Sequence, residues 1–248
     1  MKSLMGNLQK LGKALMTPIA VLPAAALLMR LGAADVFNVP VMAAAGNAIF
    51  DNLSLLFALG VTMGLANGAG AAALAGGVGY HVLLKVLGTI NTEINMGVLA
   101  GIISGCVAAL LYNKYKDIRL PAYLGFFGGK SFVPIVTSFT MLILGIILGY
   151  IWPPIQEVIY AAGEWTIQSG ALGIGIFGFL NRLLIPFGLH HVINSLVWFV
   201  FGEFTNVAGE IVTGDLNRFF AGDPTAGMFM TGFFPVMMFG LPAACLAM

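Results

Sequence analysis

Long apolar runs alternate with short polar connections along most of this chain. Four stretches without a charged residue are long enough to form membrane helices: 52–84, 94–113, 131–156 and 225–248. Crossing a hydrocarbon core of about 30 Å takes roughly 20 apolar residues in a helix. The pattern therefore predicts an all-α fold, a polytopic membrane helical bundle.

Prolines, glycines and Asp or Asn pairs punctuate the first five predicted spans. The first span, 14–33, is interrupted by Pro18 and Pro23, and Asp51 with Asn52 can cap a helix that opens the second. We expect the fifth to end at Trp152-Pro153-Pro154 and an amphipathic piece on the outer surface to follow. Between these breaks we expect a second span that ends at Gly70, a third span at 71–88 and a fourth span at 96–112.

From Gly170 onward the apolar runs become short, with Gly and Pro between them. Broken or re-entrant helices at membrane depth are tolerated only where they are buried in protein or line a cavity. We therefore interpret 1–150 as a membrane scaffold and 151–248 as transport machinery with broken, re-entrant helices.

Charge is scarce, at 8% of residues, and its distribution indicates orientation. Basic residues cluster before the first span and in 114–130, whereas the other connections are acidic or neutral. By the positive-inside rule the N-terminus and the 114–130 loop are cytoplasmic, with four crossings between them. A net charge of +1 without a basic surface argues against a nucleic-acid partner.

The stretch 181–196 concentrates polar groups inside an apolar region. Arg182 follows an apolar run, and His190 and Asn194 share one face of a helix that begins near Leu189, whereas His191 points elsewhere. These donors and acceptors suit an uncharged, polyhydroxylated ligand. The alternative is that Arg182 reaches to the membrane interface and the His pair caps broken backbone.

Other polar positions favour structural roles. Lys130 ends a Phe-Phe-Gly-Gly-Lys run that could serve a sugar or a phosphoryl donor, or form an ordinary basic loop. His81 is expected to pack with a hydrogen bond, Glu93 to be a solvated loop acid, and the glycines Gly97, Gly101 and Gly105 to pack one helix face closely. No metal-ligand spacing, nucleotide-binding loop or nucleophilic triad is visible, so no metal or cofactor is predicted.

Three blocks resemble a known family. LPAYLGFFGGKSFVPI (120–135), NRLLIPFGLHHVINSLVWF (181–199) and GDLNRFFAGDPTAGMFMTGFFPVMMFGLPAACLAM (214–248) are similar to the membrane-embedded EIIC domain of sugar phosphotransferase systems. Within the glucose superfamily, the last block resembles the N-acetylglucosamine branch. The resemblance covers the whole chain.

The resemblance implies a homodimeric sugar permease of a bacterial inner membrane. It also implies that 1–150 is the dimerisation half and that 151–248 is the first part of the sugar-binding half. The sugar, N-acetylglucosamine or else glucose, would be translocated and phosphorylated on its 6-hydroxyl by the phosphocysteine of an EIIB domain. The family's sugar-contacting Arg and His fall on Arg182 and His190; Asn194 and Lys130 complete our predicted substrate site. The family's catalytic Glu, in a GITE motif, would lie beyond Met248, which implies a truncated sequence and leaves the catalytic residue unknown. EIIB would be a separate chain or part of a continuation.

Two other classes stay open. An ion-coupled sugar transporter would need an intramembrane acid for the coupling proton, whereas the few acids of the second half are expected in loops. A chain without the last spans could also be an inactive membrane module that folds and dimerises.

Overall fold

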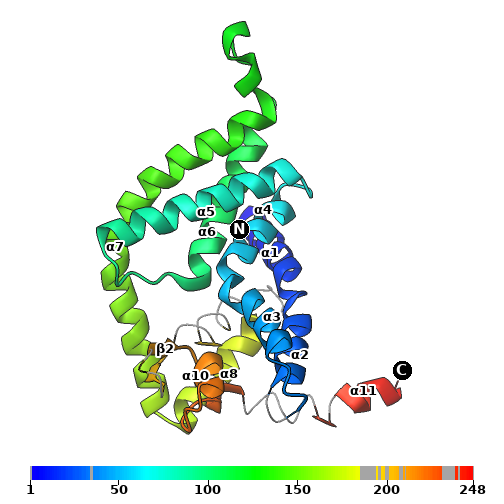
Figure 1. Ribbon diagram of the computed structural model, residues 1–248, viewed down its shortest axis with the longest axis vertical. Coiled ribbons are helices and arrows are strands. Elements are labelled where there is room, and N and C mark those ends of the chain that lie inside the picture. The colour runs from blue at the N-terminus through cyan, green and yellow to red at the C-terminus, as the bar shows by residue number, and fades with distance from the viewer. Residues whose placement is uncertain are drawn as a thin grey trace. The chain divides into compact units, whose positions relative to one another are not determined.

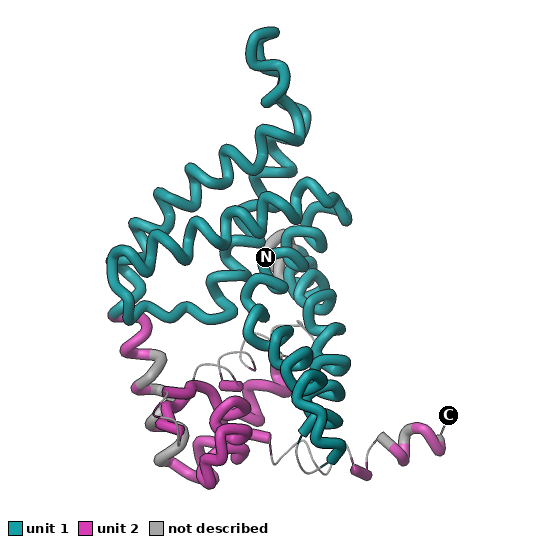
Figure 2. Tube along the Cα trace, viewed as in Figure 1, with its two compact units in different colours: residues 1–153 teal, residues 154–248 magenta. Residues whose placement is uncertain are grey.

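The protein divides into two compact units, residues 1–153 and 154–248 (Figure 2). This computed structural model describes residues 2–33, 36–184, 194, 197–198, 201–206, 209, 211–230, 238–239 and 241–247. The boundary between the units falls inside a helix, between Pro153 and Pro154.

Unit 1 is built from helices (Figure 1). They are α1 Lys2–Ile19, α2 Leu22–Gly32, α3 Pro40–Asp51, α4 Leu53–Leu65, α5 Gly70–Ile90, α6 Gly97–Tyr115, the short 3-10 helices η1 Ala122–Phe127 and η2 Gly129–Ser131, and the first part of α7 Phe132–Gln168. This helical content confirms the predicted all-α fold class.

Proline shapes the first span as predicted. α1 contains Pro18 in its last turn and stops at Ile19, and α2 restarts with Pro23 at its beginning. Pro23 is tolerated at the start of α2 because the first amides of a helix have no acceptor within the helix. Together α1 and α2 form a candidate membrane span, Gln9–Gly32.

The second span differs from the prediction, because helix α3 precedes Asp51 and joins α4 at a bend of 56°. Asn52 sits at this bend, and its side chain makes no cap bond to α4. Instead its Nδ2 donates to the carbonyl oxygen of Ala48 at 2.9 Å. The predicted cap is therefore wrong at Asn52, whose amide extends the hydrogen bonding of α3.

Small residues bring α4 and α6 together. A Cβ on Gly101 would lie 1.9 Å from the Ser54 carbonyl oxygen, and one on Gly105 would lie 2.8 Å from Cβ of Val61. Thr62 Oγ1 donates to Ala58 O at 2.5 Å and lies 3.2 Å from Gly105 O. The glycine face therefore packs closely, as predicted, but against α4 of the same chain, so it does not support the expected dimer contact.

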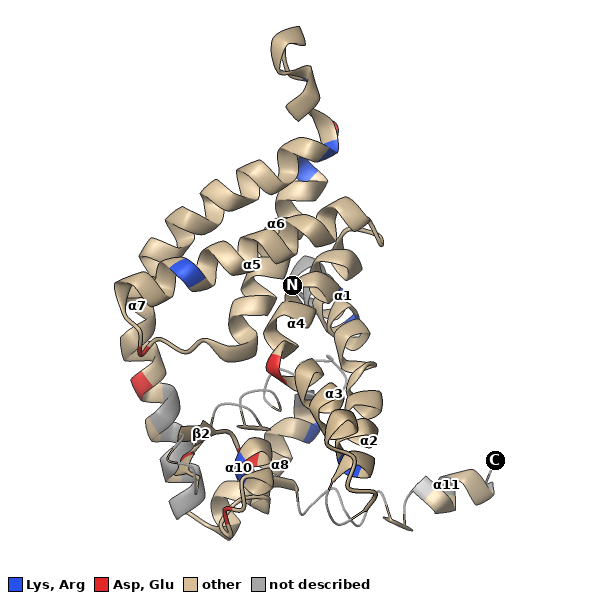
Figure 3. Ribbon diagram, in the orientation of Figure 1, with Lys and Arg blue, Asp and Glu red and all other residues tan. Residues whose placement is uncertain are grey.

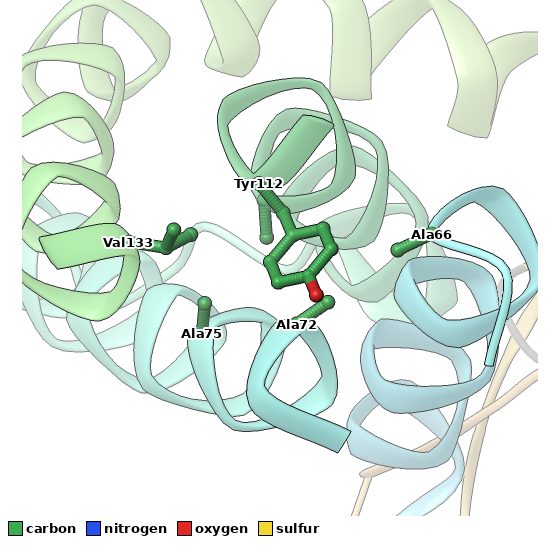
Figure 4. Packing of buried hydrophobic residues seen from close by; sticks show 6 residues of the cluster. Ala66, Ala72, Ala75, Tyr112 and Val133 are labelled. Atoms are coloured by element: carbon green, nitrogen blue, oxygen red, sulfur yellow. The ribbon is translucent and has the colours of Figure 1, made fainter. Parts of the chain in front are cut away.

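A buried apolar cluster forms where α4, α5, α6 and α7 meet (Figure 4). The Tyr112 ring lies among small side chains, with Val133 of α7 beside it. The cluster contains Ala66, Ala72, Ala75, Ala108, Tyr112 and Val133. Four alanines let the helices approach closely, and the single large ring fills the space that remains.

α7 is one helix of 37 residues and passes through Pro153-Pro154. The prediction that this pair ends the helix is therefore wrong. Each proline removes one backbone bond, but its φ near −65° is a helical value. The helix therefore continues past the two prolines although two backbone hydrogen bonds are missing.

Four helical segments of the described chain are long and apolar enough to cross a membrane, or five if α3 and α4 count as one bent span. They are Gln9–Gly32, Gly70–Ile90, Gly97–Tyr115 and Gly129–Val158. Charged residues along them are sparse (Figure 3). With α3–α4 counted as one span, four candidate spans precede the 116–130 loop, which is the number that the predicted orientation requires.

Unit 2 contains shorter elements. They are the end of α7, α8 Ala171–Leu184, strands β1 Glu203–Thr205 and β2 Ile211–Thr213, α10 Asp215–Phe220, the 3-10 helix η4 Met228–Met230 and α11 Leu241–Ala247. The strands pair antiparallel, with Phe204 opposite Val212. This hairpin was not predicted, because strands of three residues are too short to show a periodicity.

Candidate functional site

One face of α8 is buried and ends in an amide. Gly173, Phe177 and Asn181 follow one another at intervals of four residues, and all three are buried. Residues four apart share a helix face, so this helix presents a small residue, an aromatic ring and then a polar group. Asn181 is only 2% exposed, which requires a hydrogen-bond partner for its amide.

Asn194 supplies that partner. Asn181 Nδ2 donates to Asn194 Oδ1, and Asn194 is itself 6% exposed. Each side-chain amide carries two N–H donors and an oxygen with two lone pairs. The bond uses one donor of Asn181 and one lone pair of Asn194. The pair is thus a fixed amide assembly with further hydrogen-bonding capacity.

Aromatic and aliphatic side chains pack beside the amide pair. Phe177, Val197 and Phe229 are buried together, and Trp198 and Phe201 pack against them. The rings of Phe177 and Phe229 form a T-shaped contact, with 5.4 Å between their centroids and 85° between their planes. Phe177 lies one turn from Asn181, so polar and apolar surfaces adjoin within unit 2. Sites for neutral polar ligands combine such surfaces.

The predicted site residues have different outcomes. Arg182 is exposed and follows the buried Asn181 along α8, and Asn194 bonds to Asn181. Lys130 is exposed in η2, in the other unit. His190 and His191 lie outside the described residues. The sequence interpretation missed Asn181. Its signal was an amide side chain inside the apolar run 171–184.

The other polar residues of unit 1 can also be placed. His81 is exposed on α5, and its ring packs edge-on against that of Tyr80, with 5.4 Å between the ring centroids. The predicted hydrogen bond of His81 stays a prediction. The apolar sequence around His81 did not indicate that its ring is exposed, where it can face lipid or a partner. Glu93 is exposed in the connection after α5, as predicted.

A second polar cluster lies at α10 and the turn after it. Arg218 Nε and Nη2 donate to Asp223 Oδ2 at 2.8 and 2.5 Å, and Nη2 also donates to Thr225 Oγ1 at 2.9 Å. Thr225 donates its backbone N–H and its hydroxyl to Asp223 Oδ1, at 2.8 and 2.7 Å. Arg218 and Asp223 are each 5% exposed. The network folds the turn back onto α10.

Asp215 opens α10 next to this network. It is 2% exposed, and its Oδ1 accepts the Gly227 N–H at 2.9 Å. The few acids of the second half were expected in loops; Asp215 is instead a buried helix residue, and Asp223 is buried in its turn. Sequence position therefore misplaced Asp215, whose preceding Gly214 suggested an open loop, whereas Asp223 does lie in a loop, although it is buried there.

The two carboxyls are shifted in opposite directions. Burial raises the pKa of Asp215, and the Gly227 amide and the Arg218 charge only partly oppose it. Burial also acts to raise the pKa of Asp223, but the hydrogen bonds from Thr225 and from Arg218 outweigh it, and the pKa is lowered. At neutral pH Asp223 is therefore firmly ionised, whereas Asp215 binds a proton more readily than an ordinary carboxyl.

The assembled groups can bind a neutral polar ligand by hydrogen bonds rather than perform nucleophilic chemistry. Within the described residues, no group of three or more His, Cys, Asp or Glu side chains is arranged to hold a metal ion. Amides, a guanidinium and an aromatic surface are the groups that unit 2 offers. Hydroxyl and amide groups of a sugar match them in kind.

Comparison with known proteins agrees with the resemblance seen in the three sequence blocks. The chain is 62% identical over 247 residues to the PTS system N-acetylglucosamine-specific EIICBA component of Escherichia coli (strain K12), covering 99% of this chain and 38% of that protein. It is 55% identical over 242 residues to the N-acetylglucosamine-specific EIICB component of Bacillus subtilis (strain 168), covering 97% and 52%.

A glucosamine-specific EIICBA component of Bacillus subtilis (strain 168) is 49% identical over 254 residues, covering 97% of this chain and 40% of that protein. The chain thus spans about half or less of the length of these relatives. The family model described as phosphotransferase system, EIIC, matches residues 12–248. Since that match covers nearly every residue, the chain belongs to the EIIC family of phosphotransferase systems.

Proposed function

We propose that this chain is the sugar-translocating part of an N-acetylglucosamine permease of the phosphoenolpyruvate-dependent phosphotransferase system. The observation that carries the proposal is the buried Asn181–Asn194 amide pair beside Arg182 on α8. The names of the relatives at 62% and 55% identity support the choice of sugar. Glucosamine and glucose are the alternative substrates.

In this proposal the hydrogen-bonding groups hold the sugar while a partner supplies the phosphoryl group. Arg182 donates a planar fork to sugar hydroxyls and offsets developing phosphoryl charge. Asn194 and Asn181 present amide donors and acceptors, which suit both hydroxyls and an acetamido group. His190, on sequence grounds, holds the attacking hydroxyl. An EIIB phosphocysteine completes the transfer, and the names of the relatives, EIICBA and EIICB, support that partner.

The test uses the full-length protein in cells that lack their own amino-sugar and glucose transporters. Uptake of radiolabelled N-acetylglucosamine is measured with unlabelled N-acetylglucosamine, glucosamine or glucose as competitor. We expect N-acetylglucosamine to compete at the lowest concentration. Equal or better competition by glucosamine or glucose would contradict the proposed specificity. Arg182→Lys should lower uptake, and His81→Ala serves as the exposed control.

Ion-coupled transport is a second candidate, because Asp215 is buried and has a raised pKa. A buried carboxyl with a raised pKa takes up a proton more readily than an ordinary one, and such a group could couple sugar and proton movement. The two mechanisms differ in their energy source. Uptake by a phosphotransferase permease requires EIIB and phosphoenolpyruvate and yields a sugar phosphate, whereas ion-coupled uptake survives loss of EIIB and collapses with a protonophore.

The orientation in the membrane is part of the proposal. Lys10, Lys13 and the basic loop after α6 favour a cytoplasmic N-terminus in a bacterial inner membrane. Cysteines introduced at positions 3 and 115, in a background without Cys106 and Cys245, should react only with reagents that reach the cytoplasm. Labelling of either site by an impermeant reagent on intact cells would reverse the orientation.

The division of labour and the assembly state are proposed as well. Residues 1–150 would serve as a scaffold and dimerisation half, and 151–248 would begin the transport half. The close α4–α6 packing supports a rigid scaffold, whereas the buried polar groups of unit 2 support a binding role. Cross-linking of the full-length protein in native membranes should yield dimers through unit 1, and monomers alone would contradict this arrangement.

A further inference from the structure

Two adjoining cavities lie in unit 1, between α1, α4 and α6. The first, of about 490 Å³, is the more polar of the two and is lined by Lys10, Lys13, Thr17 and Asn67, among others. The second, of about 400 Å³, is mainly apolar and is lined chiefly by Leu11, Cys106, Ala109 and Leu110. Lys10, Leu65 and Asn113 line both.

The cavities lie at one end of three membrane-crossing helices. Lys10 is in the first turn of the span Gln9–Gly32, Leu65 is the last residue of α4, and Asn113 is in the last turn of α6. The apolar cavity follows α6 from Asn113 back to Cys106, about 10 Å at a rise of 1.5 Å per residue. It therefore extends from the interface toward the hydrocarbon core.

The polar cavity is built to attract an anion. Lys10 and Lys13 are three residues apart on α1, and Thr17 follows four residues later, so the three line one helix face. No Asp or Glu is among the described residues that line either cavity. Two ammonium groups side by side repel each other, and a bound anion would relieve that repulsion. Thr17 adds a hydroxyl donor.

The neck between the cavities is held by a hydrogen bond. Asn113 Nδ2 donates to the carbonyl oxygen of Leu65 at 3.1 Å, which ties the end of α6 to the end of α4. Asn67 follows in a left-handed conformation, with φ of 54°, and turns the chain toward α5. The cationic cavity and the apolar cavity thus share a defined wall.

We propose that the paired cavities bind an anionic phospholipid. The phosphodiester headgroup lies between Lys10 and Lys13, and one acyl chain lies along Leu65, Ala109 and Leu110. A free phosphate would use the polar cavity alone and leave the apolar one without a function. Basic residues at a membrane surface attract anionic lipid, and the contiguous apolar cavity supplies the contact with its chain.

The test uses the full-length protein in a neutral detergent, with binding of phosphatidylglycerol followed by native mass spectrometry. The probes are phosphatidylglycerol, phosphatidylethanolamine and inorganic phosphate. The Lys10→Gln/Lys13→Gln variant should bind phosphatidylglycerol about tenfold more weakly or worse. The matched control is Lys114→Gln/Lys116→Gln, which removes two charges near the same membrane face but outside both cavities, and should bind as the parent does.

The second variant tests the apolar cavity. Leu110 is 70% exposed, so Leu110→Trp can narrow the cavity without entering the core. We expect it to weaken phosphatidylglycerol binding and to leave dimerisation unchanged. Equal binding of phosphatidylethanolamine, equal losses in both double variants, or complete competition by inorganic phosphate would each overturn the lipid site. Loss of dimerisation in the Lys10→Gln/Lys13→Gln variant, with lipid binding retained, would assign the surface to a second copy instead.

Discussion

The two units use buried polar groups in different ways. In unit 1 the hydroxyls of Thr62 and Ser104 are fully buried, and each donates to a backbone carbonyl of its own or a neighbouring helix. In unit 2 the buried polar groups are amides and charges that bond to one another, as in Asn181–Asn194 and Arg218–Asp223. Hydroxyl-to-carbonyl bonds hold helices together in unit 1, whereas the buried polar side chains of unit 2 satisfy one another.

The glycines show the same contrast. In unit 1, Gly101 and Gly105 permit a contact of α4 with α6 that no larger residue would allow. On α8 of unit 2, a Cβ on Gly175 or Gly178 would meet no atom within 4 Å in the part of the chain that the structure describes. Packing therefore restricts the glycines of the α4–α6 contact but not those of α8, which fits different roles for the two units.

The largest expected effect comes from filling the α4–α6 contact. Gly101→Val places a Cβ where the Ser54 carbonyl oxygen lies, at 1.9 Å in the present geometry. Forcing the helices apart should cost about 1–3 kcal/mol or more. Thermal unfolding in detergent measures the loss. Gly88→Ala is the matched control, since its Cβ meets no described atom within 4 Å, and unchanged stability of Gly101→Val would break the comparison.

The next effect comes from breaking the ion pair of unit 2. Arg218→Ala leaves the buried Asp223 carboxylate with only its bonds from Thr225. We expect a loss of about 2–3 kcal/mol, the range for hydrogen bonds to charged groups, because the exposed neighbours Gly222 and Pro224 keep water close. Proteolysis of the 215–227 segment should accelerate. A parent-like digestion rate would mean that the network does not hold the turn.

A smaller effect concerns pH. The pKa of Asp223 is lowered on folding, so its stabilisation is fully present above the ordinary value of 3.8 and is lost as pH falls through the folded pKa. The pKa of Asp215 is raised, so its effect has the opposite sign, and its protonation favours folding at low pH. With Asp223→Asn, the free energy of unfolding of unit 2 should fall less on acidification than in the parent. With Asp215→Asn, it should fall more.

The smallest effect should come from the open glycines of α8. Gly175→Ala and Gly178→Ala should change stability by about 0.5–1 kcal/mol or less, in the stabilising direction, because alanine loses less backbone entropy on folding. Thermal unfolding of both variants checks this. A strong destabilisation by either would show that α8 is packed as tightly as α6, and the contrast between the units would fail.

Much of the fold could be predicted from the sequence because spans in lipid need long uncharged runs. The break between Pro18 and Pro23 and the packing of Gly101 and Gly105 are local properties of short stretches. The course of α7 through Pro153-Pro154 was mispredicted, because helix continuity depends on the turns on both sides of the prolines.

The site was predictable only in part. The exposed Arg182 and the buried Asn194 lie in a stretch whose polarity was visible in the sequence, and His190 remains a prediction. The bond between Asn181 and Asn194 joins residues 13 positions apart in the sequence, which no spacing rule indicates. The Arg218–Asp223–Thr225 network depends on a turn that reverses onto α10. Such pairings follow from three-dimensional arrangement rather than from spacing.

The central claim is that the buried amides of unit 2 serve sugar transport, whereas the buried hydroxyls of unit 1 serve packing. The direct measurement is N-acetylglucosamine uptake per folded protein for Asn181→Leu/Asn194→Leu and for Thr62→Val. Replacing both amides by apolar groups of similar shape should be nearly neutral for stability, yet we predict loss of uptake. Thr62→Val should lose about 1 kcal/mol of stability and keep its uptake. Parent-like uptake by the double variant would contradict the account.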